Sequence, residues 1–173
     1  MVKKILPAKD PFLRQVAKPV TSIDKKIKGV IADLKDTLSV QNDPEGVGLA
    51  APQIGKSLRM FYIKHKGISS VFINPEILFF GPLLKNTAKE KIMEGCLSLP
   101  HFYGPLVRAG KIKLKYLNEE GQETIQEIAG FPAQIVQHEV DHLNGVLFVD
   151  RILEQKKKLY KLEGDEEWEE VDL

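Results

Sequence analysis

Residues 137–142, with the sequence QHEVDH, combine residue types and a spacing that could bind a metal ion and move a proton. Residues four apart lie on one face of a helix, so His138 and His142 can direct two imidazoles at one ion. Glu139 lies one residue along, where its carboxylate can reach a water molecule at the ion without being a ligand. This is the HExxH pattern of two metal-binding histidines and a glutamate general base.

The HExxH pattern requires a helix, and the surrounding sequence predicts one. Apolar residues between Pro132 and Leu143 recur close to the helical period. Pro132 suits a first helical turn, and Gly145 follows where the helix is expected to end. The alternative is a helix with two surface or packed histidines and a solvated glutamate. Three fixed residue types on a helical pattern favour the metal site.

A catalytic metal site usually has three protein ligands and leaves a fourth position for water or substrate. The candidates for the third ligand are Cys96, His65, His101 and a carboxylate. We favour Cys96, because no helical or alternating pattern places it in a core and a metal-bound thiolate is a strong anionic ligand. The neighbours of His65 predict an exposed turn, and His101 is expected at the rim of the site.

The chemistry of such a site is hydrolysis. The metal would polarise a carbonyl, and Glu139 would take a proton from water and pass it to the leaving nitrogen. Gln53 and the backbone N–H of Leu97 are the candidates to stabilise the oxyanion. Gln53 belongs to a segment of small residues, 46–53, which by itself would equally predict a tight turn.

The composition excludes several broad classes of protein. The chain has 173 residues, a formal net charge of +1 and one cysteine, so no internal disulfide can form. We find no membrane span, signal segment or nucleic-acid motif. We expect a soluble, cytoplasmic monomer with one catalytic domain over residues 1–163 and an acidic, flexible tail over residues 164–173.

The predicted elements alternate in a way that indicates an α+β fold. We expect antiparallel strands packed around the HExxH helix, with helices near both ends of the chain. The expected helices cover residues 10–16, 23–38, 132–143 and 150–162, and the expected strands cover residues 60–63, 71–73, 77–80, 85–93, 111–116, 123–128 and 146–149.

Three segments, taken in order, resemble the peptide deformylase family. That family has the motifs GxGLAAxQ, EGCxS and QHExDH, which stand here at residues 46–53, 94–98 and 137–142. The resemblance covers residues 5–149. It implies an enzyme that removes the formyl group from N-formylmethionine at the start of newly synthesised polypeptides and releases formate.

The resemblance also implies roles for individual residues. By motif position, Cys96 joins the two histidines as a metal ligand and Glu139 is the general acid/base. Gln53 and the N–H of Leu97 hold the formyl oxygen as it becomes an oxyanion. The usual metal of the family is Fe²⁺, and Zn²⁺, Ni²⁺ or Co²⁺ can occupy the site.

An apolar methionine pocket and four further features follow from the same resemblance. Gly48 matches a position whose backbone pairs with an extended substrate, and Glu94 with Arg108 matches a structural ion pair. Residues 101–104 stand where the family varies beside the substrate cleft, which leaves preferences after methionine open. Basic residues 156–158 could contact the ribosome transiently, or form a solvated helix face. The expected lining of the pocket is Val47, Ile92, Leu97, Ile135 and the apolar side of His138.

Three other interpretations remain to be weighed. A zinc peptidase would need a third histidine or glutamate after His142, where the chain offers only Glu154, Glu163 and the acidic tail, with no further histidine. A protein that binds formylated peptides without turnover would not require intact Glu139, Gln53 and Cys96. A purely structural metal site would normally have four protein ligands, and the sequence offers no clear fourth.

Overall fold

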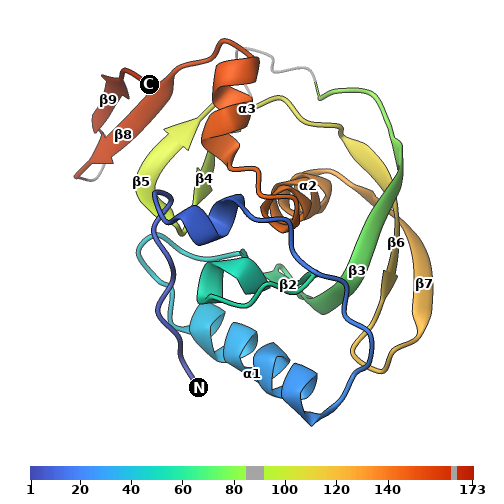
Figure 1. Ribbon diagram of the computed structural model, residues 1–173. Helices are drawn as coiled ribbons and strands as arrows, with labels where there is room; N and C mark the ends of the chain where they lie inside the picture. The colour runs from blue at the N-terminus through green and yellow to red at the C-terminus, as the bar shows by residue number, and fades with distance from the viewer. Residues whose placement is uncertain (85–91, 165–166) are drawn as a thin grey trace.

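The computed structural model describes residues 1–84, 92–164 and 167–173 (Figure 1). Within these ranges the chain forms an α+β fold with two antiparallel sheets, ordered β1-β2-β3-β6-β7 and β4-β5-β8-β9. The elements, with η for 3-10 helices, are η1 (Pro11–Arg14), α1 (Lys25–Ser39), β1 (Gly48–Ala50), η2 (Ala51–Ile54), β2 (Met60–His65), β3 (Ile68–Phe80), β4 (Glu94–Cys96), β5 (Leu99–Gly104), β6 (Lys111–Leu117), β7 (Glu123–Ala129), α2 (Phe131–Leu143), α3 (Phe148–Glu154), β8 (Leu159–Glu163) and β9 (Glu167–Val171).

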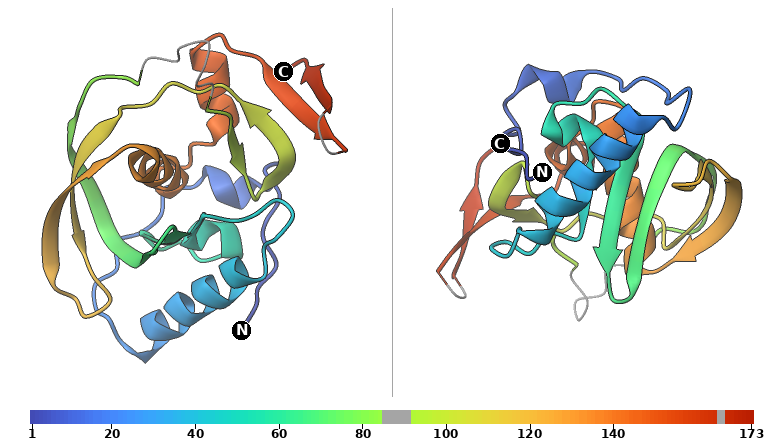
Figure 2. Two further views of the ribbon diagram at one scale, coloured as in Figure 1. Left: turned by 180° about the vertical axis from the view of Figure 1, so that it is seen from behind. Right: turned by 90° about the horizontal axis from the view of Figure 1, so that it is seen from below.

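The helix α2 is buried over nearly its whole length. Pro132 lies in its first turn, and every residue from Ala133 to Leu143 is buried. Figure 1 and the reverse view in Figure 2 show it almost end-on, near the middle of the molecule. The side chain of Gln137 donates to the carbonyl of Ala109 over 2.8 Å and accepts from the N–H of the same residue over 3.2 Å. A buried polar side chain therefore ties α2 to the segment before β6.

The amphipathic helix α1 covers one face of the larger sheet, as its apolar stripe predicts. Asp24 caps it by accepting a hydrogen bond from the N–H of Ile27 over 2.9 Å. Its buried residues recur three and four positions apart and pack with residues of β1, β2 and β3. The short helix predicted at residues 10–16 is the 3-10 helix η1, capped by Asp10.

The strands of the larger sheet follow the predicted alternation. β6 and β7 form the expected hairpin, with Lys111 opposite Ala129 and Leu117 opposite Glu123. The two strands predicted at residues 71–73 and 77–80 are one continuous strand, β3, which bends through two irregularities in its pairing with β6. The predicted strand over residues 85–93 lies mostly outside the described residues, and residues 92 and 93 are not in a strand.

The prediction for the C-terminal region was wrong in its secondary structure. The helix expected over residues 150–162 is α3, which begins at Phe148 and ends at Glu154. Lys156 has a positive φ of 52°, a left-handed conformation that a helix cannot contain. The chain then forms β8 and β9, so residues 167–171 of the expected flexible tail are paired with β8. The strand expected at residues 146–149 is not formed, because residues 146 and 147 lead into α3 and residues 148 and 149 belong to it.

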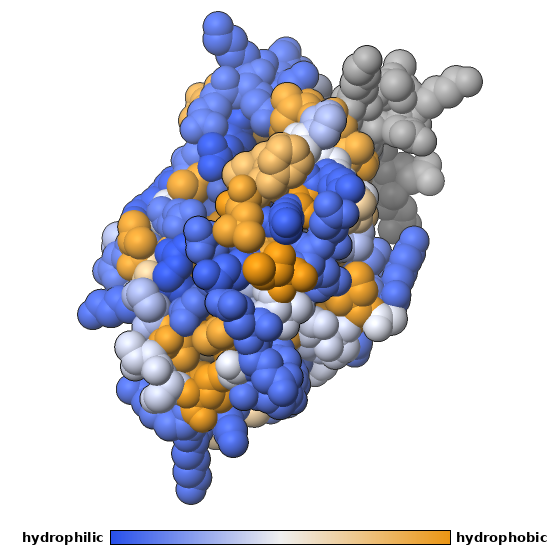
Figure 3. All heavy atoms as spheres, turned by 90° about the vertical axis from the view of Figure 1, so that its right-hand side faces the viewer, coloured by the Kyte–Doolittle hydropathy of each residue, from blue (hydrophilic) through white to orange (hydrophobic). Residues whose placement is uncertain are grey.

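The surface of the described residues is mixed in polarity. On the face in Figure 3, apolar residues lie in separate groups among hydrophilic ones. The hairpin of β6 and β7 carries exposed ion pairs, Lys111 with Glu127 and Lys115 with Glu123. The search for a helix long and apolar enough to cross a membrane found no candidate among the described residues.

Candidate active site

Three potential metal ligands converge in the structure. Cys96 ends β4, while His138 and His142 lie one turn apart on α2, and their ligand atoms all lie within 4.8 Å of one another. The sulfur of Cys96 is 3.3 Å from Nε2 of His142. Both histidines are buried and the cysteine is partly buried. Within the described part of the chain, the other candidates, His65 and His101, lie outside this cluster.

The surroundings of the two histidines fit a bound metal ion. Nδ1 of His138 lies 2.6 Å from a carboxylate oxygen of Glu94, which holds the N–H at Nδ1 and directs Nε2 into the cluster. Burial lowers the pKa of His142 well below its usual value, which favours the neutral form that a metal requires. Two imidazoles and a thiolate are a ligand set that divalent transition metals accept.

A network of buried charges holds Glu94 in place behind His138. Arg108 donates two hydrogen bonds to Glu94, over 2.7 and 2.6 Å, and a third to Asp141 over 3.0 Å. Arg151 of α3 donates two more to Asp141. Burial alone would raise the pKa of Glu94, but the hydrogen bonds from Arg108 and His138 hold it at about 2. The ion pair expected between Glu94 and Arg108 is therefore present, and it extends to α3.

Replacing Arg108 with methionine should destabilise the metal-free protein by about 3–5 kcal/mol, because the buried carboxylate of Glu94 would lose its guanidinium partner and Asp141 would keep only Arg151. Urea unfolding at neutral pH measures this change in the free energy of unfolding. Lys111→Met is the matched control, since it breaks an exposed ion pair and should cost at most about 1 kcal/mol. Similar losses in the two variants would contradict a stabilising role for the buried network.

Glu139 has the environment of a group that exchanges protons near neutral pH. Its side chain is buried, and Oε2 has no hydrogen-bond partner among the described residues. Burial raises the pKa of this carboxyl to about 7. The backbone of Gly48 passes so close that a Cβ there would lie 2.6 Å from Oε1. Glycine at this position therefore leaves the carboxylate room beside the cluster.

The amide of Gln53 is oriented toward the cluster by its own hydrogen bonds. Its Oε1 accepts from the N–H of Ala50 over 2.9 Å, so its NH₂ group faces the other way. That group lies 3.1 Å from the hydroxyl of Ser98 and 3.6 Å from the sulfur of Cys96. The short helix η2 thus presents a buried donor beside the potential metal ligands.

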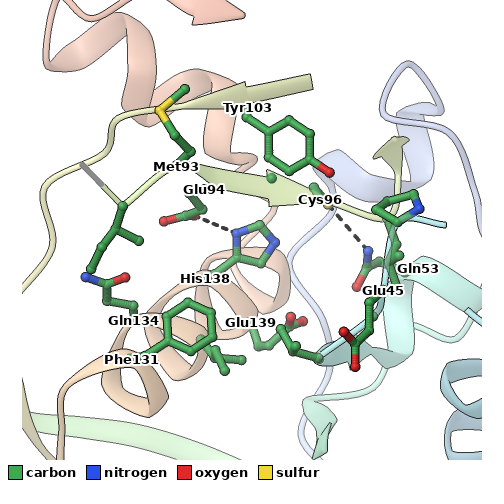
Figure 4. Close-up of a pocket in the computed structure, with 18 of the residues that line it drawn as sticks. Glu45, Gln53, Met93, Glu94, Cys96, Tyr103, Phe131, Gln134, His138 and Glu139 are labelled. Carbon is green, nitrogen blue, oxygen red and sulfur yellow. Dashed lines mark hydrogen bonds and ion pairs between the residues drawn. The ribbon is translucent and has the colours of Figure 1, made fainter. Parts of the chain in front are cut away.

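A cavity of about 200 Å³ joins these groups (Figure 4). Every residue expected in the methionine pocket lines it, and so do Gly48, Gln53, Cys96 and Glu139. His142 forms part of the cluster without lining the cavity. The residues that line the cavity and were not predicted are Pro44, Glu45, Gly46, Met93, Glu94, Gly95, Phe131 and Gln134, while His101 and Tyr103 belong to the segment 101–104 that was expected beside the substrate cleft.

Some of the cavity residues that were not predicted could have been found from the sequence. Phe131 and Gln134 lie four residues before Ile135 and His138, so helical spacing places them on the same face of α2. Glu45 has no comparable signal, because only the folded chain brings it to the cavity.

The geometry indicates a class of protein first: a hydrolase with a potential site for one metal ion, with a buried carboxylate and an amide donor beside the potential ligands. Comparison with known proteins then gives the family. The family model for polypeptide deformylase matches residues 2–158. The chain belongs to the polypeptide deformylase family, which confirms the resemblance found in the three motifs.

Individual relatives agree with this assignment. The peptide deformylase of Pseudothermotoga lettingae is 43% identical over 152 residues, which span 88% of this chain and 84% of the relative. The crystal structure of the Thermotoga maritima peptide deformylase matches with a TM-score of 0.78 and 41% identity, over 87% of this chain and 97% of that one. A class I type b enzyme from Acinetobacter baumannii with bound Met-Ala-Ser matches with a TM-score of 0.79 and 34% identity, over 88% and 99% of the two chains.

Proposed function

We propose that this protein removes the formyl group from the N-terminal formylmethionine of newly synthesised polypeptides and releases formate. The observation that carries the proposal is one cavity in which Cys96 and His138, two of the three potential metal ligands, adjoin Glu139 and an apolar wall. Formylmethionine has a group for each part of the cavity. Its small formyl carbonyl suits the part beside the potential metal ligands and Glu139, and its unbranched apolar side chain suits the apolar wall. Membership of the family supports the same reaction.

Cys96, His138 and His142 would hold the metal ion, which we propose to be Fe²⁺, with Zn²⁺, Ni²⁺ or Co²⁺ able to take the same ligands. When bound, such an ion polarises the formyl carbonyl and lowers the pKa of water. The cluster has three members among the described residues. Three ligands suit a catalytic site, whereas a structural site would normally be closed by a fourth protein ligand.

Glu139 would carry the proton between the two halves of the reaction. It takes a proton from water as the water oxygen attacks the formyl carbon, and it gives that proton to the methionine nitrogen as the carbon–nitrogen bond breaks. The products are formate and a free amino terminus. A carboxyl group with a pKa of about 7 can both accept and donate a proton near neutral pH.

Gln53 and the backbone N–H of Leu97 would stabilise the negative charge that develops on the formyl oxygen. The NH₂ group of Gln53 is already directed at the cluster before substrate binds. A donor that needs no reorganisation is the kind that stabilises an oxyanion most effectively.

Gln53→Leu should lower kcat by a factor of about 10² to 10³ with a much smaller change in KM, because the donor acts mainly on the transition state. Steady-state kinetics on a formylated peptide measure both constants. Ser98→Ala is the control, since it removes the hydroxyl beside the same NH₂ group and keeps the donor. An increase in KM with unchanged kcat would make Gln53 a simple binding group.

The substrate would lie extended along the free edge of β1. This strand is at the end of the five-stranded sheet, and Gly48 lies on it beside the cavity. An extended peptide can pair with such an edge. Its first side chain would then enter the apolar pocket formed by Val47, Ile92, Leu97 and Ile135.

The test is formate release from formyl-Met-Ala-Ser by protein loaded with Fe²⁺ without oxygen. Rapid release of formate, with Met-Ala-Ser as the other product, is the expected result. Release of free methionine from unformylated Met-Ala-Ser would instead identify a peptidase. Tight binding of the formylated peptide with no product would identify a binding protein.

The cellular setting follows from the substrate. Formylated chains arise at the ribosome, so we place the reaction in the cytoplasm. We propose residues 1–163 as the catalytic domain. Lys156 and Lys157 remain candidates for a transient ribosome contact, while Lys158 pairs with Glu170. We propose a monomer, as expected from the sequence.

A further inference from the structure

The C-terminal hairpin of β8 and β9 brings a distant segment of the chain to the cavity. The match to the family model ends at residue 158, immediately before β8. β8 pairs with the outer side of β5, and β9 pairs with β8. The hairpin therefore extends the small sheet that carries Cys96, although neither of its strands lines the cavity itself.

Strand register places Trp168 on the same face of this sheet as Tyr103. Gly95 is opposite Tyr103, Tyr103 is opposite Tyr160, and Tyr160 is opposite Glu170. Opposite residues in paired strands point to one face. Trp168 lies two residues before Glu170, so it shares that face.

The two aromatic rings are in direct contact. The ring centroids of Tyr103 and Trp168 are 5.5 Å apart and the planes meet at 83°, an edge-to-face arrangement. Trp168 remains 47% exposed. A large exposed aromatic side chain that reaches across β8 to a cavity residue needs an explanation beyond core packing.

Tyr103 forms a wall of the cavity close to the potential metal ligands. Its ring lies over Gly95, where a Cβ would be 2.6 Å from a ring carbon of Tyr103. Gly95 directly precedes Cys96, so this wall is one residue from the cluster. Figure 4 shows Tyr103 and Phe131 on opposite sides of His138. A substrate that leaves the methionine pocket along this side meets an aromatic surface.

We propose that the C-terminal hairpin is a specificity element, in which Trp168 holds Tyr103 in place as an aromatic wall for the substrate residues after formylmethionine. The wall favours substrates with an aromatic side chain at the second or third residue, because such a side chain can pack against Tyr103. Trp168 is a positioning residue and touches no reacting atom. This inference rests on the proposed deformylase function.

The test compares formyl-Met-Ala-Ser with formyl-Met-Tyr-Ser and formyl-Met-Ala-Tyr. In the parent, one of the tyrosine peptides should have the higher kcat/KM. Trp168→Ala should reduce that advantage by about three- to tenfold, the scale of one aromatic contact, through KM and not kcat. Trp168→Phe should retain most of it. Val171→Ala is the control, because Val171 lies on β9 and points to the opposite face.

A second measurement needs no substitution. Trp168 is the only tryptophan in the chain, so the tryptophan emission of zinc-loaded protein reports directly on this contact. The emission should change on binding of Met-Tyr-Ser or Met-Ala-Tyr and change less with Met-Ala-Ser. The specificity role would be overturned if the three peptides changed the emission equally and if Trp168→Ala lowered kcat/KM by the same factor for all three formylated peptides. Absence of formate release by the parent would overturn the proposed function itself.

Discussion

Glu139→Gln is expected to lower kcat by a factor on the order of 10² to 10⁴ and to leave the metal bound. The glutamine side chain keeps the size of glutamate and loses the ability to accept a proton from water. The ligands Cys96, His138 and His142 are untouched, so metal content should stay at one equivalent. Formate release under single-turnover conditions, together with metal analysis of the same sample, measures both quantities.

The control for this experiment is Glu127→Gln, which removes the same charge from the exposed surface of β7. Its kcat should equal that of the parent. The free energy of unfolding gives a further readout, because Oε2 of Glu139 is buried and has no hydrogen-bond partner among the described residues. Removing an unpaired buried carboxylate should not lower the free energy of unfolding. Turnover retained by Glu139→Gln would remove this residue from the mechanism.

The α2 helix could be predicted from the sequence because all of its signals are local. Its expected range of residues 132–143 differs from the observed Phe131–Leu143 by one residue. The spacing of His138 and His142 fixes their common face wherever the helix lies in the fold. The same local argument explains why the hairpin of β6 and β7 was predicted correctly, since two alternating segments flank a turn.

The convergence of Cys96 with the histidines depends on the whole fold. The three-residue strand β4 carries this cysteine, and the pairing of β4 with β5 places it against α2. Its chemistry and sequence surroundings, and then the motif resemblance, indicated Cys96 as a ligand, while its spacing from the histidines along the chain could not show that they converge. Glu45 was missed for the same reason, because it reaches the cavity through contacts between segments far apart in sequence.

The error at the C-terminus also has a physical cause. Residues 148–162 contain apolar positions that suit either a helix or a strand, so intrinsic preference alone could not decide between them. The decision is made by β5, whose edge opposite β4 pairs with β8 at Phe102 and Tyr103. A long-range strand partner therefore overrode the local helical signal after residue 154.

Cys96→Ala is expected to abolish stoichiometric metal binding, because the remaining two histidines supply too few ligands to hold the ion. Cys96→Ser should bind metal only weakly, since a hydroxyl oxygen is a poorer anionic ligand than a thiolate. The direct measurement is metal content after gel filtration, with folding verified by circular dichroism. Full occupancy in Cys96→Ala would mean that another side chain completes the site, with His101 as the first residue to replace.

Because Cys96 is the only cysteine, thiol chemistry gives a test on the unmodified chain. A bound ion should protect the sulfur from a thiol reagent, and removal of the ion by a chelator should restore its reactivity. Lowering the pH should also release the ion, since protons compete for the sulfur and for both imidazoles. Gln53→Leu is the matched comparison, because it changes a neighbour of the sulfur and leaves all three ligands in place. Protection by metal in that variant, with kcat strongly reduced, would separate metal binding from oxyanion stabilisation.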